Sequence, residues 1–202
     1  MNNTASSDNL LSSESHSKRK HSKIEEPLYQ GVKKALTAYL QADDKIDIRL
    51  EITADTFPET LKTHVQKELL FLLENKTYRP DLFGHIGGSD CTSIYGKSDF
   101  ILTVEVKPRA ITLKDIFQAK MYGEIYSTPF AFLISPERPK QRLLELIKLR
   151  PDFLGYSAGL QTLYFCRYFQ HDETLDLWFN KREPRNKGPY GPGSRPITRV
   201  IE

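Results

Sequence analysis

Residues 78–108 read YRPDLFGHIGGSDCTSIYGKSDFILTVEVKP. Two largely apolar segments, 78–86 and 99–108, flank a stretch that is rich in Gly, Ser and Asp and therefore favours a turn. We predict that the two segments are antiparallel strands of one hairpin. Opposed positions in a hairpin sum to a constant, so a register that sets position 81 opposite position 105 puts the turn apex at residue 93, within the turn-forming stretch, and the sequence permits it.

One face of this hairpin would carry polar side chains, and the opposite face would carry apolar ones. Asp81 follows Pro80, which cannot donate to a strand ladder and so marks a strand start. Side chains alternate between the faces of a strand, so Glu105 and Lys107 share one face while Val106 points to the other. In this register the two carboxylates lie about 5 Å apart. They would repel each other unless a cation lies between them, and Mg²⁺ prefers carboxylate, water and phosphate oxygens.

The other predicted elements alternate between helix and strand. Apolar periodicity predicts helices over 24–41, 58–75, 112–126 and 139–149, and strands over 46–53, 129–135, 162–169 and 174–179. Thr112, followed three residues later by Asp115, predicts a capped start for the third helix. A hairpin inside the sheet argues against a doubly wound parallel arrangement. We therefore expect an α/β fold with a mixed β-sheet flanked by helices.

The two ends of the chain differ in composition from its middle. The chain carries a net charge of +3, yet residues 1–23 hold four basic against two acidic side chains, and residues 181–202 hold six against two. Both segments lack apolar periodicity, so we expect disordered tails around a single domain, 24–180. Basic tails can hold a polyanion loosely, or they can serve only to keep the protein in solution.

Composition also restricts the compartment and the classes of site. No apolar run approaches the roughly 20 residues that span a bilayer, and the polar N-terminus does not resemble a secretion signal. Cys91 and Cys166 are the two cysteines, which excludes a cysteine-based structural zinc site within one chain and gives no disulfide framework. We expect a cytoplasmic protein, intracellular and not secreted, without a membrane partner.

The hairpin residues resemble the signature of a known enzyme superfamily. Asp81 with its preceding proline, followed by Glu105, Val106 and Lys107, is similar to the PD-(D/E)XK nuclease motif. The order of strand, strand, helix and apolar strand is also similar to the core of that family, and the resemblance covers about residues 60–136. It implies a restriction-endonuclease-like mixed sheet.

The next predicted helix extends the resemblance. Gln118 and Tyr122 are four residues apart, so they project from one helical face, and they resemble the Gln-x-x-x-Tyr motif of RecB-type members. The family usually has a further glutamate on a helix before the aspartate strand. We favour Glu68, whose helix leads directly into that strand, with Glu25 or Glu26 of the first helix as the alternatives.

The resemblance implies hydrolysis of phosphodiester bonds. The two motif carboxylates and the carbonyl of Val106 would hold Mg²⁺ or Mn²⁺, Lys107 would orient the attacking water or neutralise charge on the phosphate, and Gln118 and Tyr122 would position the lysine or the nucleic acid. The expected partner is nucleic acid, DNA in the first place, and a homodimer stays open. The alternatives are a catalytically inactive nuclease-fold protein that acts as a nucleic-acid-binding or assembly module, and a chance match in an unrelated α/β protein.

Overall fold

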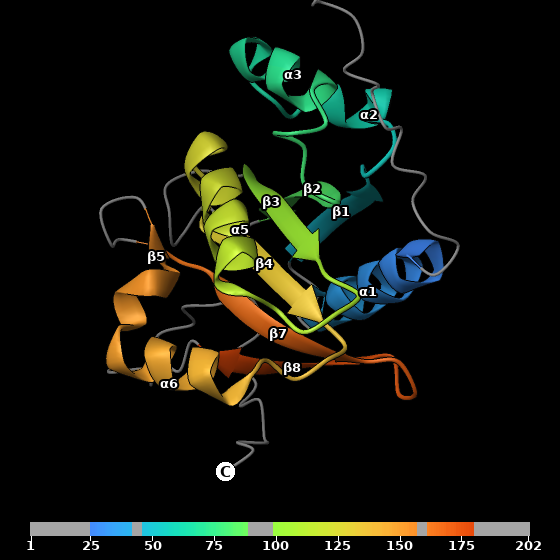
Figure 1. The fold of residues 1–202 in the computed structure, drawn as a ribbon. Coiled ribbons are helices and arrows are strands. Elements are labelled where there is room, and N and C mark those ends of the chain that lie inside the picture. Colours follow the sequence, from blue (N-terminus) through green and yellow to red (C-terminus); the bar gives the residue numbers. More distant parts are fainter. Residues whose placement is uncertain (1–24, 42–45, 89–98, 157–160, 180–202) are drawn as a thin grey trace, which may run out of the picture.

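The computed structural model describes residues 25–41, 46–88, 99–156 and 161–179 (Figure 1). The predicted tails, 1–23 and 181–202, lie outside the described residues. The helices are α1 (Glu25–Leu40), α2 (Glu59–Lys62), α3 (Lys67–Glu74), α5 (Leu113–Ile125), α6 (Gln141–Leu149) and the 3-10 helix η1 (Pro151–Leu154). The strands are β1 (Ile46–Ile52), β2 (Leu82–Gly88), β3 (Asp99–Val106), β4 (Phe130–Ser135), β5 (Gly155–Tyr156), β6 (Gln161–Thr162), β7 (Tyr164–Phe169) and β8 (Thr174–Phe179).

The chain is an α/β protein with a mixed sheet of six strands in the order β1-β2-β3-β4-β7-β8. The pairs β1–β2, β2–β3 and β7–β8 are antiparallel, whereas β3–β4 and β4–β7 are parallel. Helix α5 makes the crossover between β3 and β4, and α6 lies in the crossover between β4 and β7. All six residues of β4 are buried, which confirms the prediction that this apolar run is a central strand.

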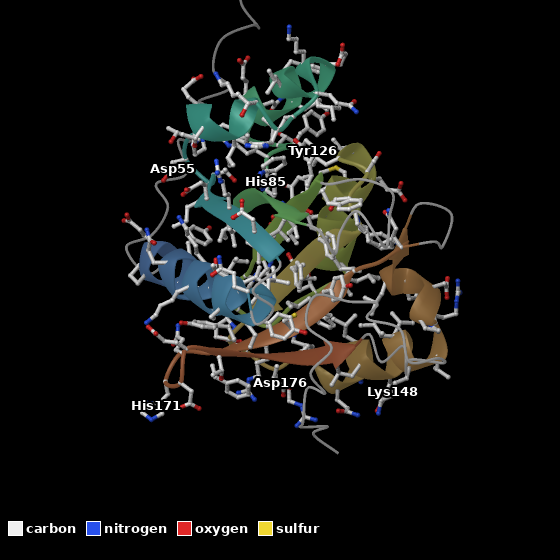
Figure 2. All side chains as sticks on the ribbon, turned by 180° about the vertical axis from the view of Figure 1, so that it is seen from behind. Asp55, His85, Tyr126, Lys148, His171 and Asp176 are labelled. Carbon is white, nitrogen blue, oxygen red and sulfur yellow. The ribbon has the colours of Figure 1, made fainter. Side chains whose placement is uncertain are left out.

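Helices cover both faces of the sheet, as Figures 1 and 2 show from opposite sides. The apolar stripe of α1 packs on one face, against side chains of β2, β3 and β4 that include Leu82, Val104 and Phe132. Helices α5 and α6 pack on the other face, against Leu133 and Phe165. Each fully buried Leu or Phe side chain contributes about 1.5–3 kcal/mol, so both layers stabilise the fold.

A third cluster joins the insertion between β1 and β2 to the same face as α5. Its buried members are Leu61, Val65, Leu73, Phe83, Tyr122 and Tyr126. The insertion contains α2 and α3, which replace the single helix predicted over 58–75. The chain between them forms four-residue turns, in which the backbone N–H groups of His64 and Val65 donate to the carbonyls of Leu61 and Lys62. β-branched Thr63 and Val65 are weak helix formers and so favour the break at this point.

The start of α5 confirms the predicted cap. The Asp115 carboxylate accepts hydrogen bonds from the backbone and hydroxyl of Thr112 at 2.8 and 2.7 Å, and Arg109 donates to both carboxylate oxygens at 2.8 and 3.0 Å. Although burial of Asp115 raises its pKa, these hydrogen bonds outweigh burial and lower the pKa below its ordinary value. The first turn of α5 is thereby fixed close to the end of β3.

The first strand of the hairpin begins later than predicted. The predicted strand 78–86 starts only at Leu82, because the preceding carbonyls are engaged elsewhere. Tyr126 donates its hydroxyl to the carbonyl of Tyr78 at 2.8 Å, and Thr53 donates its hydroxyl to the carbonyl of Pro80 at 2.6 Å. These carbonyls therefore have no role in the sheet ladder.

Candidate metal-binding site

The register of the β2–β3 hairpin agrees with the sequence prediction. Leu82 pairs with Val104, so the next position outward sets Asp81 opposite Glu105. Asp81 lies in a bend immediately before β2, and its Oδ2 accepts the backbone N–H of Val106 at 2.8 Å. The aspartate carboxylate is therefore held directly beside the second strand of the hairpin.

Glu105 is the most enclosed member of the candidate site. Its side chain is only 2% exposed, and its Oε1 accepts a hydrogen bond from Nζ of Lys107. Its Oε2 is buried and has no hydrogen-bond partner among the described residues. Burial, and next the charge of Asp81, raise the pKa of Glu105 to about 8, against the opposing effect of Lys107. A buried carboxylate with a free oxygen beside a second carboxylate is suited to a cation.

Lys107 keeps its proton at this position. Burial lowers its pKa, but the carboxylates of Glu105 and Asp81 outweigh burial, so the pKa is raised above its ordinary value. The charge of Glu105 favours the ammonium group most, and that of Asp81 favours it as well. Lys107 is thus a hydrogen-bond donor and a positive charge, and it is poorly suited to act as a general base.

The Gln-x-x-x-Tyr residues meet the lysine from α5. Oε1 of Gln118 lies 3.5 Å from Nζ of Lys107, and Nε2 of Gln118 donates to the hydroxyl of Tyr122 at 3.0 Å. Tyr122 in turn donates to the carbonyl of Thr77 at 3.4 Å. Burial, followed by the nearby charge of Glu105, raises the pKa of Tyr122, so the phenol stays protonated. A continuous row of hydrogen bonds therefore runs from the lysine to the segment that precedes Asp81.

One residue at the site has no counterpart in the sequence prediction. Tyr29 of α1 is buried, and its hydroxyl donates to Oδ1 of Asp81 at 3.4 Å. In the sequence it is one of several apolar positions on an amphipathic helix, 52 residues from the aspartate. Only the packing of α1 on the sheet brings the two together.

The further glutamate is not identified by the structure. Glu68 is exposed in the first turn of α3, and Glu26 is exposed in the first turn of α1, three residues before Tyr29. The side chain of Glu25 lies outside the described ones. Among the described residues, no three His, Cys, Asp or Glu side chains form a group that could hold a metal ion. The structure therefore does not bring Glu68 to the carboxylate pair, and the helix that reaches Asp81 is α1.

The donor groups that are present suit a hard divalent cation. Mg²⁺ is commonly bound through one or two carboxylates, with water and substrate phosphate oxygens as its other ligands. Asp81 and Glu105 supply the carboxylates, and the unpartnered Oε2 of Glu105 supplies a buried acceptor. Val106 contacts Asp81 through its N–H, and a metal-binding role for its carbonyl stays a prediction.

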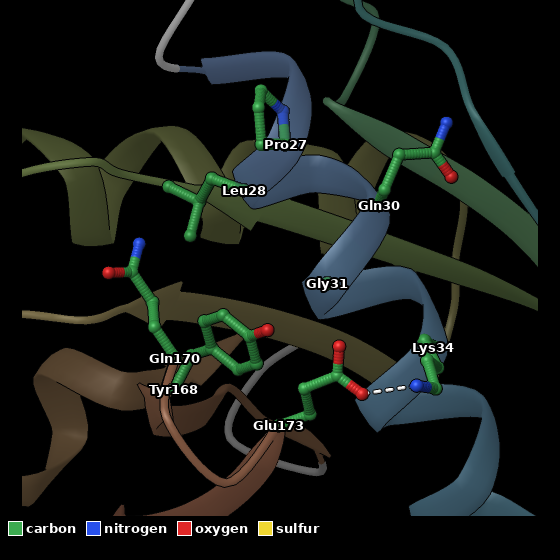
Figure 3. A pocket seen from close by; sticks show the side chains of 8 residues that line it. All are labelled: Pro27, Leu28, Gln30, Gly31, Lys34, Tyr168, Gln170 and Glu173. Carbon is green, nitrogen blue, oxygen red and sulfur yellow. Dashed lines mark hydrogen bonds and ion pairs between the residues drawn. The ribbon is translucent and has the colours of Figure 1, made fainter.

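A pocket of about 580 Å³ lies elsewhere, between α1 and the turn that joins β7 to β8 (Figure 3). Its lining includes Gln30, Tyr168 and the ion pair of Lys34 with Glu173. None of the predicted site residues lines it, and its charged groups neutralise each other. The pocket is therefore separate from the candidate site.

No protein-family model matches the sequence, and neither the curated proteins nor the solved structures contain a match. None of the helices in the described ranges is long and apolar enough to span a bilayer. The assignment of a function therefore depends on the residues at the site and their geometry.

Glu105→Gln is expected to change the pH dependence of stability in the metal-free protein. The pKa of Glu105 is raised from 4.5 to about 8, so its contribution to stability is complete below about pH 4.5 and is lost as the pH rises through about 8. Glutamine does not titrate, so the variant lacks this loss. Urea unfolding in EDTA, from about pH 5 to pH 8, should show the variant gaining free energy of unfolding relative to the wild type as the pH rises. Parallel profiles would contradict the raised pKa.

Proposed function

We propose that the chain is a divalent-metal-dependent nuclease of the PD-(D/E)XK type, which hydrolyses phosphodiester bonds with DNA as the expected substrate. The observation that carries the proposal is the contact of Glu105 with Lys107, and of Lys107 with Gln118, beside Asp81. The order β2, β3, α5, β4 also supports it, because the same order is expected of the family core.

Each residue has a role that follows from its surroundings. Asp81 and Glu105 would bind Mg²⁺ or Mn²⁺ through their carboxylate oxygens. The ion would supply polarisation of the phosphate and a bound water of lowered pKa. Lys107 would donate a hydrogen bond to the attacking water, which orients it, or to a non-bridging phosphate oxygen, which carries negative charge in the transition state. As the water adds to phosphorus it would lose a proton to solvent, and the bond to the leaving oxygen would break, with that oxygen taking up a proton from solvent. Gln118 would hold Lys107 in place, and Tyr122 would hold Gln118.

The test is to incubate the full chain with linear, circular and single-stranded DNA, and with RNA, in Mg²⁺, in Mn²⁺ or in EDTA. Cleavage is expected in either metal and should be lost in EDTA. Calorimetry with Mn²⁺ alone should detect binding to the wild type, and Asp81→Ala should remove it. Nucleic-acid binding without cleavage or metal binding would refute the proposal and support the inactive-module alternative.

A further inference from the structure

Residues 77–81 lie between α3 and β2 and belong to neither a helix nor a strand. Most of their carbonyl groups nevertheless accept a hydrogen bond. On the α5 side, the hydroxyls of Tyr122 and Tyr126 donate to the carbonyls of Thr77 and Tyr78. On the β1 side, Thr53 donates its hydroxyl to Pro80 at 2.6 Å and its backbone N–H to the carbonyl of Asp81 at 2.8 Å. An irregular segment bonded on both sides is held in one conformation.

Arg79 binds the same segment to the insertion that contains α2 and α3. Its side chain is buried, and its guanidinium donates to the carbonyl of Leu73 at 3.3 Å, and to those of Ala54 and Asp55 at 3.4 and 2.8 Å. Leu73 lies near the end of α3, and the other two carbonyls follow β1. One cationic side chain therefore fixes the distance between the two ends of the insertion.

The two carboxylates of the candidate site differ in how they are held. Glu105 lies within β3, which pairs with strands on both sides. Asp81 lies outside the ladder, and its carboxylate is placed by the backbone of residues 77–81, by the N–H of Val106 and by the hydroxyl of Tyr29. Metal–ligand distances must be met within about 0.2 Å. The position of Asp81 therefore depends on the side chains that hold this segment.

We propose that Arg79 and Tyr126 are positioning residues that hold Asp81 in place for metal binding. The inference rests on the proposed nuclease function, because it assumes that Asp81 binds a metal. In this role neither residue would bind the metal or the substrate itself; the partners of their side chains are backbone carbonyls. Both act through the backbone of residues 77–81, Arg79 from within the segment and Tyr126 from α5.

The experiment compares Tyr126→Phe and Arg79→Met with two control variants at another position, which are chosen to destabilise the protein by similar amounts. Tyr126→Phe removes one hydroxyl and is matched by Ile147→Val, and Arg79→Met is matched by Ile147→Ala. Ile147 belongs to the cluster between α6 and the sheet, which does not include residues 77–81. Calorimetry with Mn²⁺ alone should show affinity about 10–100-fold weaker for the two site variants. The Ile147 variants should keep the wild-type affinity at an equally lowered melting temperature.

A second measurement needs no metal. The N–H of Val106 donates to Oδ2 of Asp81, so its NMR proton shift reports the position of that carboxylate. The shift should move upfield in Tyr126→Phe and Arg79→Met, and it should stay at the wild-type value in both Ile147 variants. If Arg79→Met fails to fold, the Mn²⁺ affinity and the Val106 signal of Tyr126→Phe alone test the positioning role.

The outcomes separate this inference from the proposed function. Wild-type Mn²⁺ affinity in Tyr126→Phe, with an unmoved Val106 signal, would overturn the positioning role and leave the nuclease proposal intact. A wild-type chain that binds no Mn²⁺ would overturn both. Weakened affinity in the site variants, with cleavage recovered at high Mn²⁺, would support the inference, because a displaced ligand lowers affinity without removing the catalytic lysine.

Discussion

Lys107→Ala should lower the rate of DNA cleavage by about 10²–10³-fold, the usual cost of removing one group that stabilises charge in a transition state. The ammonium of Lys107 contacts Glu105 and lies near Gln118, and its pKa is raised, so it is a fixed positive charge at the place where the phosphate would react. Affinity for DNA should change little, because one enclosed lysine contributes little to contacts along the nucleic acid backbone.

Single-turnover cleavage in saturating Mn²⁺, together with binding measured by fluorescence anisotropy in EDTA, would test this expectation. Lys114→Ala is the matched control, since it removes the same charge from an exposed position on α5. The control should cleave at the wild-type rate. An unchanged rate in Lys107→Ala would remove the lysine from the mechanism and refute the proposed chemistry.

Gly84→Ala should destabilise the fold by about 3 kcal/mol, which lowers the melting temperature by about 6–12 °C for a domain of this size. Gly84 pairs with Leu50 across the β1–β2 ladder. A Cβ at this position would lie 2.1 Å from the carbonyl oxygen of Arg49 and 2.9 Å from Cα of Leu50. Both atoms belong to the backbone of β1, so the two strands would have to separate.

Gly31→Ala provides the comparison. A Cβ there would lie 2.1 Å from the hydroxyl of Tyr168, which is the far end of a side chain. Tyr168 lines the pocket in Figure 3, so a shift of its hydroxyl end into that space would relieve the contact without moving backbone. Alanine also gains about 0.5–1 kcal/mol over glycine inside a helix. Gly31→Ala should therefore lower the melting temperature much less than Gly84→Ala. Equal decreases in the two variants would show that the backbone of β1 shifts to accommodate the added Cβ, and would contradict the prediction.

The sequence predicts the hairpin and the central strands well, because local patterns determine them. The turn-forming residues permit the register that places Asp81 opposite Glu105, which the structure has, and the apolar run identifies β4. The capping pair of Thr112 and Asp115 fixes the start of α5 and with it the face that carries the glutamine motif.

The contacts that complete the site could not be predicted in this way. Tyr29 and Thr53 meet the aspartate segment, and Arg79 binds that segment to the insertion, through packing between elements far apart in the chain; in the sequence each is an ordinary residue of a predicted helix or strand. The break between α2 and α3 is a further example, because the apolar spacing over 58–75 is equally consistent with one continuous helix. Such features depend on tertiary structure, which a single sequence does not display.

The unequal support of the two acidic residues has a consequence for how the protein would lose activity. Glu105 lies within β3, and Lys107 directly follows that strand, where its backbone N–H donates to the carbonyl of Ile134 in β4. Asp81 belongs to a connection secured mostly by side chains, and such regions open at a lower free energy than central strands. Mild denaturation would therefore release the aspartate while the glutamate and lysine keep their places. The proposed catalytic activity would therefore be lost at a lower denaturant concentration than the one that unfolds the sheet.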